Sequence, residues 1–232
     1  MRHLASAAVA ALLIAFALPV LAKDATSDPS VYPLATCIVS GETLDPADTV
    51  TKEYDGRQVR FCCDRCVKKF EKDKAGYLAQ LDAAILEDQL PGYPMDTCPV
   101  SGEKLGGMGE PVNHVVGNRL VRLCCKNCIA DIDADPAQYI AKLDAAVVAA
   151  QGDAYSATTC PISGETLGSM GKAYDFVYAG RLVRFCCAGC IDDFHADPQG
   201  AMAKVSAASA THGEAHGGGH SQHGGDHSGH NH

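Results

Sequence analysis

A unit of about sixty residues occurs three times in this chain of 232 residues, and this repetition restricts the possible folds more than any other feature. Each copy contains four cysteines, and the twelve cysteines of the chain all lie within the copies. Trp is absent and aromatic residues make up only 6% of the sequence, so each copy can bury only a small core. We therefore expect several small modules, each stabilised by cross-links such as disulfides or a bound metal ion, rather than one large domain.

Each copy begins with a cysteine, two further residues and then Ser-Gly-Glu. These segments are residues 37–42, 98–103 and 160–165. An apolar stretch leads to a turn that contains glycine, and a strand of alternating apolar and polar residues follows. In the first copy, Val59 and Phe61 share one face of that strand. The pattern predicts a β-hairpin with one buried face in every copy.

Two helices are predicted after each hairpin. The strand leads into a cysteine cluster, and an apolar residue stands one helical turn after its last cysteine. These apolar residues are Phe70, Ile132 and Phe194. Asp135-Pro136 and Asp197-Pro198 then combine an N-cap residue with a proline suited to the first helical position. The predicted fold class is α+β, with a cysteine-bearing loop, a hairpin and two helices in each of three tandem modules.

The domain organisation follows from the repeats and from the two ends of the chain. Arg2, an apolar run and the small residue Ala22 are typical of a cleaved secretory signal peptide. We expect a signal peptide at 1–22, modules at 23–90, 91–152 and 153–211, and a tail at 212–232. The mature protein is expected in the periplasm or outside the cell, without a membrane anchor.

Charge and motifs exclude several functions. The formal net charge is −9 and no Lys/Arg-rich patch stands out, so we expect no nucleic-acid partner. The sequence shows no Ser-His-Asp set, no phosphate-binding glycine loop and no recurring carboxylate pair. We therefore expect a protein that is not an enzyme. Arg60, Arg122 and Arg184, two residues before the clusters, are expected to be solvated strand charges, with charge compensation of thiolates as the alternative.

The cysteine spacing favours metal ligation. In the first copy, Cys37 precedes the hairpin, and Cys62, Cys63 and Cys66 follow it at the predicted start of a helix. Cys66 is one helical turn from both Cys62 and Cys63, so either pair can face one ion together with Cys37. A helix N-terminus also stabilises the thiolate form, which is the form that binds metal.

Two other uses of the cysteines remain open. An exported chain with an even cysteine count and small cores is a typical setting for disulfides, which would make the modules a disulfide-stabilised interaction protein. Neighbouring cysteines and one-turn spacings close only very short loops, which argues against that function. Cys63 and Cys66 also have the Cys-x-x-Cys spacing of thiol-disulfide oxidoreductases, but the βαβ pattern of such enzymes is missing.

The cysteine at residue 37, the hairpin and the sequence Phe61-Cys62-Cys63-x-x-Cys66 resemble the TRASH domain and its relative, the YHS domain. The same motif in the third copy, residues 185–190, is similar to the cysteine motif in extensions of heavy-metal-transporting P-type ATPases. The resemblance covers all three copies. It implies treble-clef-like modules that act in heavy-metal buffering, trafficking or resistance, with a metal efflux transporter or its periplasmic component as partner.

The resemblance also implies the ligands. They are Cys37, Cys62 and Cys66 in module 1, Cys98, Cys124 and Cys128 in module 2, and Cys160, Cys186 and Cys190 in module 3. The sequence departs from the family in its longer spacing and in Ser40, Ser101 and Ser163, which stand where related folds carry a second cysteine. Cys63, Cys125 and Cys187 are therefore candidate fourth ligands, or else free or redox-active thiols.

The number of sulfurs decides the metal. Three thiolates favour Cu⁺ or a soft toxic ion and four favour Zn²⁺, so we expect about one ion of either kind per module. The tail adds seven histidines among Gly, Ser and Asp, a composition that does not fold but chelates Cu²⁺, Ni²⁺ and Zn²⁺. They are His212, His216, His220, His223, His227, His230 and His232. Met108 and Met170 lie in matching glycine-rich turns, where we expect packing over the hairpin rather than ligation.

Overall fold

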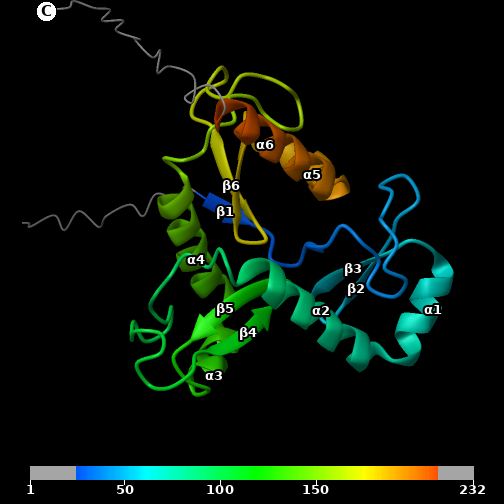
Figure 1. Ribbon diagram of the computed structural model, residues 1–232, viewed down its shortest axis with the longest axis vertical. Helices are drawn as coiled ribbons and strands as arrows, with labels where there is room; N and C mark the ends of the chain where they lie inside the picture. The colour runs from blue at the N-terminus through cyan, green and yellow to red at the C-terminus, as the bar shows by residue number, and fades with distance from the viewer. Residues whose placement is uncertain (1–24, 214–232) are drawn as a thin grey trace, which may run out of the picture.

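The computed structural model describes residues 25–213, which form an α+β protein with three antiparallel hairpins and six helices. The hairpins pair β2 (Val50–Tyr54) with β3 (Arg57–Phe61), β4 (Val112–Val116) with β5 (Arg119–Leu123), and β6 (Tyr174–Tyr178) with β7 (Arg181–Phe185). The helices after them are α1 (Asp64–Lys72), α2 (Lys74–Gln89), α3 (Cys128–Ala134), α4 (Pro136–Gln151), α5 (Cys190–Ala196) and α6 (Pro198–Gly213). Figure 1 shows three groups of elements, consistent with the predicted three-module arrangement.

Each hairpin closes through a two-residue turn with left-handed backbone at its first residue. In modules 1 and 3 both turn residues have positive φ, as at Asp55 (52°) and Gly56 (73°). This conformation matches the twist of the strands it joins. The returning strands then place Val59 and Phe61, and their equivalents in the other modules, fully inside the core. The predicted hairpins and their buried faces are confirmed.

The second helix of each module begins at a capping aspartate. Asp135 accepts a hydrogen bond from the Gln138 amide at 3.2 Å and precedes a proline at the first turn of α4. Asp73 and Asp197 make the same contact to Gly76 and Gly200. The predicted caps in modules 2 and 3 are confirmed, and module 1 uses the same cap without proline.

The core of each module lies between the hairpin and the two helices. Phe70, Ile132 and Phe194, which project from the first helix, are completely buried. Phe70 packs edge-on against Phe61 with ring centroids 5.2 Å apart, and Phe194 packs similarly against Tyr178. Module 2 has the aliphatic residues Leu123 and Ile132 where the other modules have phenylalanines. Its core therefore packs without contacts between aromatic rings.

Neighbouring modules contact each other through the second helix. The side chain of Gln89, the last residue of α2, bonds to the backbone of Asn118 and Leu120 in the next hairpin. Gln151, at the end of α4, repeats this contact with Gly180 and Leu182 of module 3. The modules therefore stack on one another in a fixed way.

The start of the described chain returns to module 3. Strand β1 (Ala25–Ser27) pairs in parallel with β6, so the third hairpin becomes a three-stranded sheet. The hydroxyl of Ser27 donates to Asp144 at 2.5 Å, and Asp144 forms a buried ion pair with Arg119 at 3.1 Å. Nothing in the sequence pattern indicates this pairing, because three residues carry too little periodicity to define a strand.

Module 1 also touches module 3 directly. Arg60 is buried, and its guanidinium donates to the backbone oxygens of His195 and Ala196 at the end of α5. The expectation that Arg60 is a solvated strand charge is therefore wrong. Contact with a neighbouring module has taken the place of water around this side chain.

Within residues 25–213, no helix is both long and apolar enough to cross a membrane. The predicted signal peptide lies outside the described residues, as do His216 and the histidines after it. His212 falls within the last turn of α6.

Candidate metal centres

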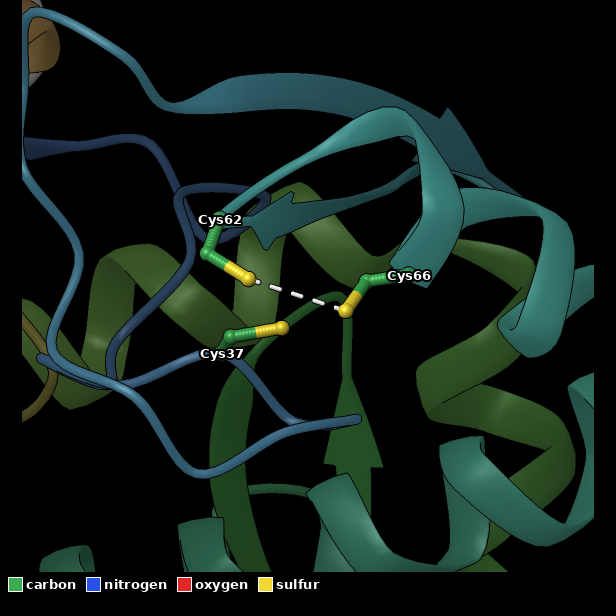
Figure 2. A group of neighbouring side chains, drawn as sticks. All are labelled: Cys37, Cys62 and Cys66. Carbon is green, nitrogen blue, oxygen red and sulfur yellow. Dashed lines mark hydrogen bonds between the residues drawn. The ribbon is translucent and has the colours of Figure 1, made fainter.

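Three groups of three cysteines come together, one in each module. They are Cys37 with Cys62 and Cys66, Cys98 with Cys124 and Cys128, and Cys160 with Cys186 and Cys190. Within each group all sulfurs lie within 4.8 Å of one another. Figure 2 shows the three sulfur atoms of the first group pointing toward one another from three separate segments.

The spacing of the sulfurs suits a metal ion. Cys62 and Cys66 have their Sγ atoms 3.6 Å apart, and the Sγ atoms of Cys160 and Cys190 are 3.7 Å apart. Thiolates bound tetrahedrally at about 2.3 Å from one ion stand about 3.8 Å from each other. All twelve cysteines are free thiols, so no disulfide competes for these sulfurs.

A tight loop presents the first cysteine of each group. Gly41 donates its amide hydrogen to the Cys37 carbonyl at 2.7 Å, and Cys37 donates to the Glu42 carbonyl at 2.8 Å. Gly41 has a φ of 75°, a conformation open to glycine and costly for other residues. The same bonds and the same positive φ occur in the other two loops. The Ser-Gly-Glu sequence therefore builds the loop that holds the cysteine.

The serine of this loop faces the second cysteine of the group. Ser40, Ser101 and Ser163 have their hydroxyl oxygens 3.4, 3.3 and 3.3 Å from the sulfurs of Cys62, Cys124 and Cys186. At this distance the hydroxyl and the thiol can share a weak hydrogen bond, in which either atom can be the donor. The serine of each loop thus lies beside the cysteine group of its module.

The adjacent cysteines Cys63, Cys125 and Cys187 do not complete the groups. Cys63 lies 3.9 Å from Cys62, and Cys125 lies 3.9 Å from Cys124 and 4.0 Å from Cys128, in each case sulfur to sulfur. None of the three lies within 4.8 Å of every sulfur in its group, and all three are half-buried. The structure therefore brings together three sulfurs per module. The fourth sulfur lies at the rim of the group, which means half-buried and beside only some of the other sulfurs.

The pKa values of the three loop cysteines are lowered. Burial alone would raise the pKa of Cys37, but hydrogen bonds from Ser40 and from backbone amides outweigh burial and lower it to about 7. The pKa of Cys98 and that of Cys160 fall to about 6 for the same reason. Burial and the neighbouring sulfurs raise the pKa of Cys128 to about 12. In each group, hydrogen bonding therefore favours the thiolate form of the loop cysteine.

The three sites differ in their exposure. Cys62 and Cys66 are half-buried, whereas all three cysteines of the groups in modules 2 and 3 are buried. Helix α1 begins at Asp64, two residues before Cys66, while α3 and α5 begin at the equivalent cysteine itself. The first site is therefore the most open of the three.

The surroundings of Met108, Met170 and Arg184 differ from those that the sequence predicts. Met108 and Met170 are 64% and 67% exposed, so the expected packing over the hairpin is wrong. Each methionine directly precedes a glycine of positive φ, Gly109 or Gly171, in a loop beside the hairpin. Arg184 pairs with Asp175 at 2.8 Å rather than with a cysteine.

The fold and these groups define a repeated α+β module with one candidate three-sulfur metal site per copy. No family model, curated protein or solved structure matches the chain.

Proposed function

We propose that this protein binds soft metal ions at its three cysteine groups and buffers or hands over these ions outside the cytoplasm. The observation that carries the proposal is the threefold convergence of three sulfurs to within 4.8 Å. One such group can arise from packing alone, but the same residues converge in all three modules. Metal binding explains why each copy keeps this arrangement.

The number of convergent sulfurs supports Cu⁺ as the preferred ion. Structural Zn²⁺ sites are almost always four-coordinate, and here the fourth cysteine stays at the rim. Cu⁺ is a soft ion that thiolate ligands select. The serine hydroxyl beside each group is a hard, neutral oxygen and adds little attraction for such an ion.

The cellular location and the partner proposed for this function are inferred from the sequence. The residues 1–22 resemble a secretory signal, and the modules resemble TRASH-like domains of metal handling. We propose export and exchange with a metal efflux system on these grounds, together with metal collection by the histidine-rich tail. A catalytic role is not part of the proposal.

The test is a joint measurement of metal and thiols on protein without residues 1–22, purified without oxygen. We expect about three Cu⁺ ions per chain, with all twelve thiols titratable once a chelator has removed the metal. Disulfides in place of titratable thiols, with no bound metal, would instead support the disulfide-stabilised interaction protein. Thiols without metal affinity would contradict both functions.

A further inference from the structure

Helix α1 carries a cationic face in an otherwise acidic chain. Arg65, Lys68, Lys69 and Lys72 recur at the spacing that places residues on one side of a helix. All four are exposed, and among residues 25–213 none of their side chains forms an ion pair. Val67 and Phe70, on the opposite side, are buried.

The equivalent helices of the other modules have the opposite charge. Helix α1 holds four cations and the carboxylates of Asp64 and Glu71, a formal charge of +2. Helix α3 holds two aspartates and no Lys or Arg, and α5 holds two aspartates, one histidine and no Lys or Arg. The sequence-based statement that the chain lacks a Lys/Arg-rich patch is therefore wrong at this helix. Because the core residues are equivalent in all three helices, packing does not account for the difference.

The cationic face borders the most open metal site. Cys66 lies within α1 directly after Arg65, between the cationic side and the buried side of the helix. Cys62 and Cys66 are half-buried, and the rim thiol of Cys63 stands 3.9 Å from Cys62. In Figure 1, α1 lies at the outer edge of module 1, away from modules 2 and 3. An approaching molecule can thus reach the charges and the sulfurs together.

We propose that the α1 face docks an acidic protein surface whose own sulfur ligands exchange metal with the Cys37, Cys62 and Cys66 site. The proposal rests on the proposed function and names the site through which metal passes. Sites 2 and 3, with buried cysteines and acidic helices, then hold metal that exchanges more slowly.

The exchange involves no redox change. A thiolate of the partner forms a bond to the ion as a bond to Cys62 or Cys66 breaks, and further substitutions complete the transfer. Protons released by the partner's thiols pass to the vacated cysteines through water. The oxidation state of the ion stays constant throughout.

A protein suits this face better than a polyanion or a membrane. The cations cover little more than two turns of one helix, while the whole chain carries a formal charge of −9. An extended anionic surface would meet this overall repulsion, whereas a small acidic patch meets only the local charge. Complementary charge of this kind mainly orients partners and raises their association rate.

The experiment measures transfer of Cu⁺ from the loaded full chain to two synthetic peptides without oxygen. Both peptides carry the same pair of cysteines, one flanked by glutamates and the other by lysines. Metal in each fraction is counted after rapid gel filtration. We expect a fast phase of one equivalent, about tenfold faster to the acidic peptide at low salt, with a difference that shrinks as salt rises.

The decisive variant replaces Arg65, Lys68, Lys69 and Lys72 together by glutamate. It should still bind about three ions and should now favour the basic peptide. The control replaces Lys104 and Lys126, exposed residues of module 2, by glutamate and should keep the preference of the unmodified chain. Cys66→Ser should remove the fast phase, since it disables site 1.

Equal rates to both peptides, or an unchanged preference in the four-glutamate variant, would overturn the docking proposal while leaving metal binding intact. Binding to phosphatidylserine vesicles that only the four substitutions abolish, without any peptide preference, would assign the face to a membrane and also overturn it. A chain that binds no Cu⁺ would refute the proposed function itself.

Discussion

Gln89 accepts a hydrogen bond from the backbone amide of Leu120 at 2.9 Å, and through this bond the end of one module continues into the hairpin of the next. Its side-chain nitrogen donates to the Asn118 carbonyl at 2.9 Å, so both ends of the amide are satisfied within the interface. The residue is only 5% exposed. Water cannot replace these bonds without opening the contact between the modules.

Gln89→Ala should therefore destabilise the protein, because it leaves a buried amide and a buried carbonyl without partners. The expected loss is about 1–3 kcal/mol in the free energy of unfolding. Urea denaturation of the metal-free protein measures it. Gln80→Ala, at an exposed position of the same helix, is the control and should change the stability by less than about 0.5 kcal/mol. Equal effects of the two substitutions would show that the interface bonds contribute nothing.

Neighbouring cysteines should differ in their importance for metal binding. Cys66→Ser should lower the bound Cu⁺ by one ion per chain, because Cys66 belongs to the convergent group of module 1. Cys63→Ser should leave the stoichiometry unchanged, because its sulfur stands outside that group. Elemental analysis of both variants gives the answer. Loss of an ion in Cys63→Ser would instead indicate a four-sulfur site.

The apparent metal affinity should rise with pH across the neutral range. The Cys128 thiol, whose pKa is raised to about 12, must lose its proton to bind an ion, and that loss is easier at higher pH. Competition with a chelator of known pH dependence measures the trend. The chain without its histidine-rich tail is the control, since histidines also titrate near neutral pH. An affinity independent of pH in both proteins would exclude the sulfurs as ligands.

The stability of the metal-free protein should change in the same direction. The pKa of Cys98 is lowered to about 6 in the folded chain, so folding favours its thiolate. The resulting stabilisation is complete above the ordinary thiol pKa and is lost as the pH falls through about 6. Cys98→Ser should flatten the dependence of unfolding free energy on pH between these limits. A slope unaffected by the substitution would contradict the assignment.

Removal of the residues after Thr211 should reduce the total metal capacity and leave the cysteine sites filled. The seven histidines lost in this truncation are independent of the three sulfur groups in sequence. Titration with Cu²⁺ and Cu⁺ in separate experiments distinguishes the two kinds of ligand. Loss of Cu⁺ from the truncated chain would show that the tail supports the modules.

The local structure of each module could be predicted from the sequence because short-range signals determine it. The alternation of Val59 and Phe61 marks a hairpin face, and Asp135 before a proline marks a helix start. The convergence of Cys37 on Cys62 and Cys66 also follows from a loop, a hairpin and a helix of known geometry.

Contacts between modules could not be predicted in this way. Gln89, Arg60 and Ser27 are polar residues whose partners lie far away in the sequence. No periodic sequence pattern predicts such contacts. The charge difference between α1 and the matching helices was missed, because its four cations form a patch only when the helix places them on one side. Its meaning depended on the finding that Cys66 lies half-buried beside it.

The pairing of β1 with β6 has a consequence for the order in which the chain assembles. Ala25 lies opposite Asp175, so the third sheet joins segments separated by most of the chain. Contacts this distant in sequence are slow to form, because a long loop must close first. Modules 1 and 2, which are made before β6 leaves the ribosome, can complete their hairpins earlier. The three-stranded sheet of the third module therefore forms last, when β6 pairs with the distant segment that forms β1.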